Sequence, residues 1–415
     1  MISSAMLAGS PAGSSEPAAR LVSLDAYRGL VIMAMTFVNY LAGVKAIPAW
    51  AKHAPDAADA YTFVDLVFPA FLFIVGVAIP LALHKRRLQG ESLAAQLKRI
   101  LLRSASLIGV GVIMVNKGCF APEAAWLPKE LWYLLTMSCV LVAWAEVPAN
   151  SLPQRQRIHL AARVTAGILL VLMLALFRGK NAAGETVWLQ TSWWGILGLI
   201  GWAYLACSIV YLLTRGNSLA LSGVLGLMLA LYVGNRHGVL HWLGPVQGVL
   251  NVGQIFGSTA ASVMMGVLVG NWFVGEAAAR TPFERARFFL LFGVGLLVAG
   301  TLVRPLHGIN KIAATEAYAL VSGGWCCLAF LVVYLLMDVG RWRAWAVPVN
   351  LVGQNAVLAY VLPGIVGSLF AIIGLSGWLW PFSSGWPGAL NAGLLTALIC
   401  TIVYALTRVG FRVRL

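Results

Sequence analysis

One histidine of this chain lies in a setting where it could do chemistry. His53 belongs to a polar segment between two apolar stretches, and Asp65 follows at the start of the second stretch. Imidazole can accept a proton near neutral pH, and a nearby carboxylate can fix its tautomer and raise its basicity. A loop histidine is also commonly just solvated. The pair therefore predicts either a catalytic base or a solvated side chain.

Other polar residues occur where the surrounding sequence is apolar. An ionisable group near the middle of a bilayer costs at least about 2.5 kcal/mol unless it is paired or hydrated. Asn39 lies in the first apolar stretch, beyond Asp25 and Arg28, whose spacing allows an ion pair on one helical face. A polar turn around His307 either returns the chain or lines a site. The remaining candidates are Asn310, Lys311, Glu316, Gln354 and Asn355.

The chain that carries these residues is strongly apolar. Its 415 residues are 60% hydrophobic and 10% charged, with a mean hydropathy of +0.85, whereas soluble domains carry about a quarter charged residues. We therefore predict an all-α, polytopic transmembrane helix bundle with about 10–12 spans. The expected spans lie at roughly 24–46, 64–84, 98–117, 129–147, 161–178, 192–213, 218–234, 257–275, 286–304, 316–338, 345–373 and 388–408.

Two of these spans are irregular. The segment 345–373 is long and contains Pro363 and Gly364, so it could consist of two broken pieces. The segment 218–234 is short for a crossing.

The distribution of basic residues predicts the orientation. Lys and Arg are retained in cytoplasmic loops, and a chain that starts inside places about two thirds of its 29 basic residues there. Both termini are therefore expected in the cytoplasm. Anionic lipids and an anionic cytoplasmic ligand account for the net charge of +15, so no nucleic-acid partner is needed. The basic run 85–103 is either a positive-inside anchor or a phosphate contact.

Residues 1–19 are expected to form a disordered cytoplasmic leader before a single transmembrane domain at 20–415. They are small and polar, and they lack the basic and apolar regions of a signal peptide. The six cysteines fall mostly in apolar stretches without metal-ligand spacing, so we expect small buried side chains and no metal site.

Several motifs, in order and spacing, resemble the heparan-α-glucosaminide N-acetyltransferase family. They are SLDAYRGL at 23–30, FVNY at 37–40, KH at 52–53, DLVFP at 65–69, FLFIVG at 71–76, GINK at 308–311 and GQNAVLAY at 353–360. The resemblance extends over most of the chain from about residue 20. The stretch LWYLLTMS at 131–138 departs from a Gly-x-Leu-Gln-Arg pattern of relatives.

The resemblance implies an acyltransferase that moves acetyl from cytosolic acetyl-CoA, used as a co-substrate without a metal, to the amine of a glucosamine-containing sugar on the periplasmic side. It implies His53 as the catalytic residue and Asn39 as its companion, and Asp65 could orient the imidazole. The expected acceptor pocket comprises Asn310, Lys311, Gln354 and Asn355. The expected contacts for the phosphates of the coenzyme are Arg28, Arg86, Arg87, Arg99 and Arg103.

The chain is expected in a bacterial inner membrane, with an amino-sugar acceptor, acetyl-CoA and membrane lipids as partners and a homodimer as an open alternative. Bacterial members of the family have also been described as N-acetylglucosamine uptake proteins. The alternative function is therefore an inner-membrane transporter of N-acetylglucosamine or a related amino sugar.

Overall fold

A computed structural model describes residues 21–147 and 152–414. Helices dominate these residues, and the predicted leader at 1–19 lies outside them. The longer helices are α1 (Val22–Leu41), α2 (Phe63–Leu88), α3 (Leu93–Asn116), α4 (Lys129–Ala143), α5 (Pro153–Ala175), α6 (Gly195–Thr214), α7 (Ser218–Arg236), α9 (Ala260–Gly270), α10 (Pro282–His307), α11 (Glu316–Tyr334), α12 (Val347–Gln354), α13 (Ala356–Ile372) and α15 (Gly385–Arg408).

Short elements connect these helices. A π-helix, Gly253–Thr259, leads into α9, and a second one, Leu335–Val339, extends α11. The short α-helices are α8 (Gly244–Gln247) and α14 (Ser376–Leu379). The 3-10 turns are Ala49–Ala51, His241–Leu243, Asn271–Phe273, Gly275–Ala279 and Ala344–Ala346. An antiparallel hairpin of β1 (Gly179–Lys180) and β2 (Thr186–Val187) follows α5.

The prediction of an all-α, polytopic membrane protein is confirmed. Within the described residues, nine helices are long and apolar enough to cross a membrane, and the bent pair of α12 and α13 would be a tenth. Each predicted span contains a helix. The nine do not include α1, which is 20 residues long, or α4, which has 15 residues and is short for a crossing.

The break in the predicted span 345–373 lies at Asn355, where α12 and α13 meet at an angle of 74°. Pro363 and Gly364, which suggested the break, lie inside α13. Proline is tolerated inside a membrane helix when neighbouring groups satisfy the freed backbone. The position of the break follows from long-range contacts of Asn355 described below.

The centre of the bundle is the span formed by the π-helix and α9. In its most apolar stretch, 89% of the residues are buried inside the protein. It packs against α2 through glycines, because a Cβ at Gly76 would lie 2.0 Å from the carbonyl oxygen of Val263, and one at Gly266 would lie 2.0 Å from that of Phe73. Small residues allow such close approach of membrane helices. This crossing fixes α2, whose first turn carries Asp65.

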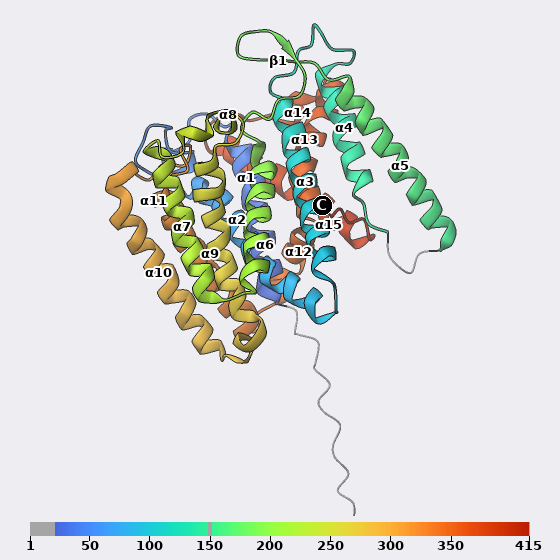
Figure 1. Ribbon diagram of the computed structural model, residues 1–415. Coiled ribbons are helices and arrows are strands. Elements are labelled where there is room, and N and C mark those ends of the chain that lie inside the picture. Colours follow the sequence, from blue (N-terminus) through green and yellow to red (C-terminus); the bar gives the residue numbers. More distant parts are fainter. Residues whose placement is uncertain (1–20, 148–151, 415) are drawn as a thin grey trace, which may run out of the picture.

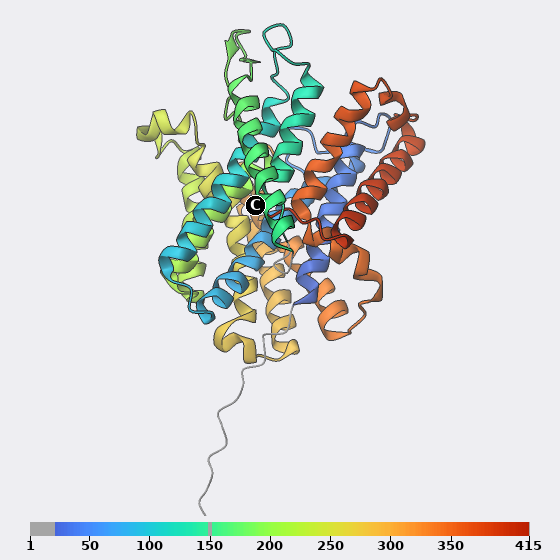
Figure 2. The ribbon, with the colours of Figure 1, turned by 90° about the vertical axis from the view of Figure 1, so that its right-hand side faces the viewer.

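The remaining helices surround this centre. In Figure 1, α10 lies at one edge of the bundle, and α4 and α5 form a hairpin at the opposite edge. Figure 2 shows α13, α14 and α15 beside α1, in agreement with the packing of α1 against both α13 and α15. The segment after α15 returns to the end of α4, where Val413 pairs with Ala145.

Candidate functional site

The site is built on the first turn of α2, where Asp65 caps the helix. Its Oδ2 accepts hydrogen bonds from the backbone N–H groups of Thr62 (2.9 Å) and Ala54 (3.1 Å). Tyr318 of α11 donates its hydroxyl to the Asp65 carbonyl oxygen at 2.5 Å. The side chain of Asp65 is 1% exposed, and a carboxylate is favoured at a helix N-terminus. Asp65 is therefore held rigidly.

His53 lies against this carboxylate. Its Nδ1 is 2.7 Å from Asp65 Oδ1, and its side chain is 43% exposed. An ionised carboxylate only accepts hydrogen bonds, so Nδ1 carries the hydrogen in this contact. The buried carboxylate thus selects the tautomer of an accessible imidazole.

Lys311 approaches the same imidazole from the segment between α10 and α11. Its Nζ lies 2.9 Å from His53 Nδ1, 3.2 Å from Nε2 and 3.6 Å from Asp65 Oδ1. Burial lowers the pKa of Lys311 below its ordinary value, although the charges of Asp65 and Asp56 oppose this shift. The structure therefore brings Lys311, Asp65 and His53 into one cluster, although they are far apart in sequence.

Asp59 and Asn310 join the two segments that form this cluster. Asp59 accepts hydrogen bonds from Arg304 Nε (2.9 Å) and from the Ile309 backbone N–H (2.6 Å). These hydrogen bonds hold the pKa of Asp59 below its ordinary value, and the bond from Ile309 has the larger effect. Asn310 donates its amide to the carbonyl oxygen of Asp56 at 2.6 Å. Asn310 thus lies at the cluster and positions its neighbour Lys311.

A second histidine and carboxylate pair lies directly behind the segment that carries Lys311. His307 Nδ1 is 2.9 Å from Glu316 Oε1, and their side chains are 11% and 2% exposed. Thr315 caps α11 and accepts from the Asn310 backbone N–H at 3.1 Å, which closes the turn between the two residues. The turn around His307 is therefore closed by side-chain contacts on both sides of Lys311.

Three other predicted site residues have different surroundings. Asn39 is exposed two residues before the end of α1, and no hydrogen bond joins it to His53 among the residues that the structure describes. Asn355 is fully buried, donates to Thr407 Oγ1 (3.1 Å) and the Phe411 carbonyl oxygen (2.9 Å), and accepts from the Val413 N–H (3.1 Å). Gln354, the last residue of α12, is partly buried. None of the three forms a hydrogen bond with His53 among the residues that the structure describes.

The arginines expected at the coenzyme contact other side chains. Arg28 pairs with Asp25 at 3.4 Å, the ion pair that the sequence allowed. Arg86 and Arg99 both bind Glu91, at 3.2 Å and 2.5 Å. Arg87 lies 3.4 Å from His84 Nδ1, and the Arg103 guanidinium is 4.8 Å from the centre of the Tyr204 ring. The hydrogen bond from Arg99, followed by that from Arg86, lowers the pKa of Glu91.

No group of three or more histidine, cysteine, aspartate or glutamate side chains with metal-binding geometry occurs in the part of the chain that the structure describes. The cysteines at 139, 207, 326, 327 and 400 are buried and Cys119 is partly buried, as the sequence predicted.

The fold and the cluster together define a polytopic membrane protein with an accessible histidine in contact with a buried carboxylate. A family model described as a domain of unknown function (DUF5009) matches residues 20–242, more than half of the chain. The chain belongs to this family.

Two relatives carry a functional name. Human heparan-alpha-glucosaminide N-acetyltransferase is 29% identical over 370 residues, which cover 82% of this chain and 52% of the human protein. The mouse protein of the same name is 40% identical over 105 residues, 25% of this chain and 15% of the mouse protein. The chain thus spans about half the length of its human relative. These matches confirm the resemblance found in the sequence motifs.

Sequence reasoning missed two contributions to the site. Thr62 and Asp65 form a capping box, and the Thr-x-x-Asp spacing ahead of an apolar run was a readable signal for it. Asp59 binds Arg304 and the segment after it, a contact between residues 245 positions apart. Such a long-range pair leaves no local pattern in the sequence.

Proposed function

We propose that this protein is a transmembrane N-acetyltransferase that transfers acetyl from acetyl-CoA to the amine of a glucosamine-containing sugar. The observation that carries the proposal is the 2.7 Å contact between the accessible imidazole of His53 and the buried carboxylate of Asp65. The names of the human and mouse relatives support the reaction class. In this reaction acetyl-CoA is a co-substrate rather than a resident cofactor.

The tautomer of His53 gives the reaction its base. With the hydrogen on Nδ1, Nε2 carries a free lone pair that can take a proton from the acceptor amine. In the direct route, the amine nitrogen bonds to the acetyl carbonyl carbon, the carbon–sulfur bond breaks, and the coenzyme leaves as a thiol once its sulfur is protonated. In the covalent route, Nε2 bonds to the acetyl carbon, the carbon–sulfur bond breaks, and the coenzyme leaves as a thiolate. The amine then takes the acetyl group from Nε2, the nitrogen–carbon bond to the imidazole breaks, and the amine proton passes to the thiolate.

Lys311 would act on the same transition state. Its ammonium donates toward the imidazole in the free protein, at 3.2 Å from Nε2, and substrate must displace this contact. A cation at that position can then stabilise the negative charge that develops on the acetyl oxygen. Asn310 would hold Lys311 in place, and Asn39, exposed at the end of α1, would face the incoming acceptor.

The two substrates would approach from opposite ends of α2. The His53 cluster lies at its first turn and Arg86 and Arg87 in its last, and the 26 residues of α2 extend about 39 Å. This length exceeds a hydrocarbon core of about 30 Å. We place the acceptor outside and the coenzyme in the cytoplasm because the basic residues gather at the second end. Reporter fusions to both termini test this orientation, which requires a cytoplasmic signal from each.

Proteoliposomes loaded with acetyl-CoA and supplied with external glucosamine test the reaction. Free coenzyme should appear inside while N-acetylglucosamine appears outside. His53→Ala should reduce the transfer rate by at least about 10²-fold, the lower end of what a positioned base contributes. His241→Ala is the matched control, because His241 is an exposed histidine whose side chain contacts the Gly238 carbonyl oxygen of its own turn.

Two results would contradict the proposal. Saturable sugar accumulation without release of coenzyme would instead indicate the transporter alternative. Near wild-type transfer by a folded His53→Ala variant would remove His53 from the chemistry.

A further inference from the structure

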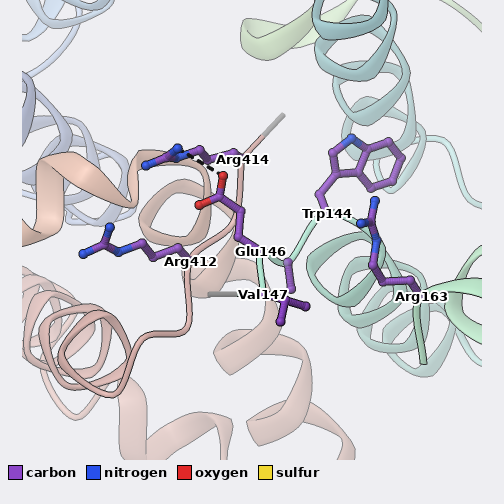
Figure 3. Close-up of a pocket in the computed structure, with 7 residues that line it drawn as sticks. Trp144, Glu146, Val147, Arg163, Arg412 and Arg414 are labelled. Atoms are coloured by element: carbon purple, nitrogen blue, oxygen red, sulfur yellow. Dashed lines mark ion pairs between the residues drawn. The ribbon is translucent and has the colours of Figure 1, made fainter. Parts of the chain in front are cut away.

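A basic hollow lies between the end of α4 and the segment after α15. Its volume is about 580 Å³. Figure 3 shows Arg412 and Arg414 leaving their segment in the same direction, with Arg163 and Trp144 on the other side of Glu146. The residues that line it are Trp144, Ala145, Glu146, Val147, Arg163, Arg412 and Arg414.

Backbone pairing fixes one wall of this hollow. Val413 pairs with Ala145 in an antiparallel bridge, the Glu146 N–H donates to the Arg412 carbonyl oxygen at 2.7 Å, and the Arg414 N–H donates to that of Trp144 at 3.2 Å. In an extended segment, residues two apart point to the same face. The pairing therefore places the side chains of Arg412 and Arg414 side by side.

Asn355 fixes the same segment from its other side. Its buried amide donates to the Phe411 carbonyl oxygen at 2.9 Å and accepts from the Val413 N–H at 3.1 Å. The break between α12 and α13 thus holds the backbone that carries the two arginines. Segments after a final helix commonly fray unless they are tied down, whereas this one is bonded on both edges.

The charges of the hollow do not balance. The described residues that line it include three guanidinium groups and one carboxylate, an excess of two positive charges among them. Glu146 pairs with Arg414 at 3.1 Å, and Arg163 donates its Nε to the Ala143 carbonyl oxygen at 2.9 Å. Among the described residues no carboxylate pairs with Arg412. Two arginines on a backbone held in place, with surplus positive charge around them, match an anion that accepts several hydrogen bonds.

We propose that this hollow binds a phosphate group through Arg412 and Arg414, with Arg163 as the opposite wall. Guanidinium forks bind phosphate oxygens bidentately, and two forks on one face can hold a phosphate monoester or diester. The phosphate has two sources, the nucleotide end of coenzyme A or the headgroup of an anionic phospholipid. The first source rests on the proposed function, and the second does not.

Binding measurements on the purified full chain distinguish the two sources. The test variant is Arg412→Gln with Arg414→Gln, and the control is Arg157→Gln with Arg287→Gln, which removes the same charge from exposed helix positions. The soluble probes are coenzyme A and pantetheine, which lacks the phosphates. The lipid probe is phosphatidylglycerol in phosphatidylcholine vesicles, whose retention by the protein is measured by mass spectrometry.

Either source gives a defined result. A rise of about tenfold or more in the Kd of coenzyme A with unchanged pantetheine binding assigns the hollow to the nucleotide end. Unchanged coenzyme affinity with loss of retained phosphatidylglycerol assigns it to a lipid headgroup. If the test variant matches the control for both probes, the proposal is overturned.

A conservative double substitution serves as a control for misfolding. Arg412→Lys with Arg414→Lys keeps the charge and loses the forks, so binding should fall between the wild type and the glutamine variant. Wild-type affinity in the folded lysine variant would rule out bidentate binding. If the wild type transfers no acetyl group but binds phosphate in an Arg412-dependent manner, the proposed function fails and this inference stands.

Discussion

Replacing Asp65 by asparagine changes the shape of the side chain little and removes one acceptor. Oδ1 faces His53 Nδ1, while Oδ2 accepts from the backbone N–H groups of Ala54 and Thr62. An amide has a single oxygen, so asparagine cannot serve both sides. If the oxygen stays with the two backbone donors, the amide NH₂ faces the imidazole, and Nδ1 must become the acceptor. The hydrogen then moves to Nε2, where the base is needed.

The expected losses follow from these bonds. A wrong imidazole tautomer costs about 10⁴ in turnover in a serine protease, and loss of a positioned base costs at least about 10². We therefore expect Asp65→Asn to lower kcat by about 10²-fold or more while the KM for acetyl-CoA stays unchanged. Losing a hydrogen bond to a charged group costs about 1.5–3 kcal/mol, so unfolding should also occur at lower temperature.

Thr62→Ala separates catalysis from stability. It removes the Thr62 hydroxyl, which donates to the Lys52 carbonyl oxygen at 2.7 Å and lies 3.3 Å from Asp65 Oδ2. It keeps the bond from the Thr62 backbone N–H to Asp65 and the contact between Asp65 and His53. The variant should lose about 0.5–2 kcal/mol of stability and keep near wild-type turnover. Acetyl transfer in proteoliposomes and thermal unfolding in detergent measure the two effects. A folded Asp65→Asn protein that turns over within about threefold of the wild type would refute a base oriented by this carboxylate.

Three further perturbations test other parts of the structure. Because burial lowers the pKa of Lys311 below its ordinary 10.5, activity that needs the ammonium should fall as pH rises through this lower value. Lys311→Arg should move that alkaline limb of the pH–rate profile upward, since arginine stays charged, and an unmoved limb would exclude Lys311. Gly266→Ala should destabilise the protein by about 1–3 kcal/mol in thermal unfolding, because its Cβ meets the Phe73 carbonyl oxygen, whereas Gly295→Ala, with nothing within 4 Å, should not. Joint replacement of the cytoplasmic arginines by glutamine should weaken coenzyme binding at low salt; these are Arg86, Arg87, Arg99 and Arg103. Unchanged affinity would leave their segment with only a role in membrane topology.

The sequence predicted those features that depend on local composition. Long apolar runs require helices because a bilayer offers no partner for backbone groups, so the all-α bundle followed from hydropathy alone. The contact between His53 and Asp65 could be anticipated because both residues lie near the start of one helix. Lys311 came from a motif resemblance, and its contact with His53 joins residues 258 positions apart.

The features that the sequence did not predict depend on long-range contacts. Asn355 was expected at the acceptor, but its amide is bonded to residues 407, 411 and 413. A side-chain amide within an apolar stretch needs a hydrogen-bond partner, but the surrounding sequence does not reveal which residue supplies it. The same contacts explain why the helix breaks at Asn355 rather than at Pro363.

The contacts that join residues 53–65 to residues 304–318 also determine when the cluster can form during synthesis. The ribosome makes His53 and Asp65 early, but Lys311 and Tyr318 follow more than 240 residues later. Until α10 and α11 have entered the membrane, the imidazole lacks its cation and the first turn of α2 lacks the hydroxyl of Tyr318. A nascent chain released before that point would carry the histidine without its complete surroundings. Completion of the cluster is therefore coupled to insertion of the second half of the protein.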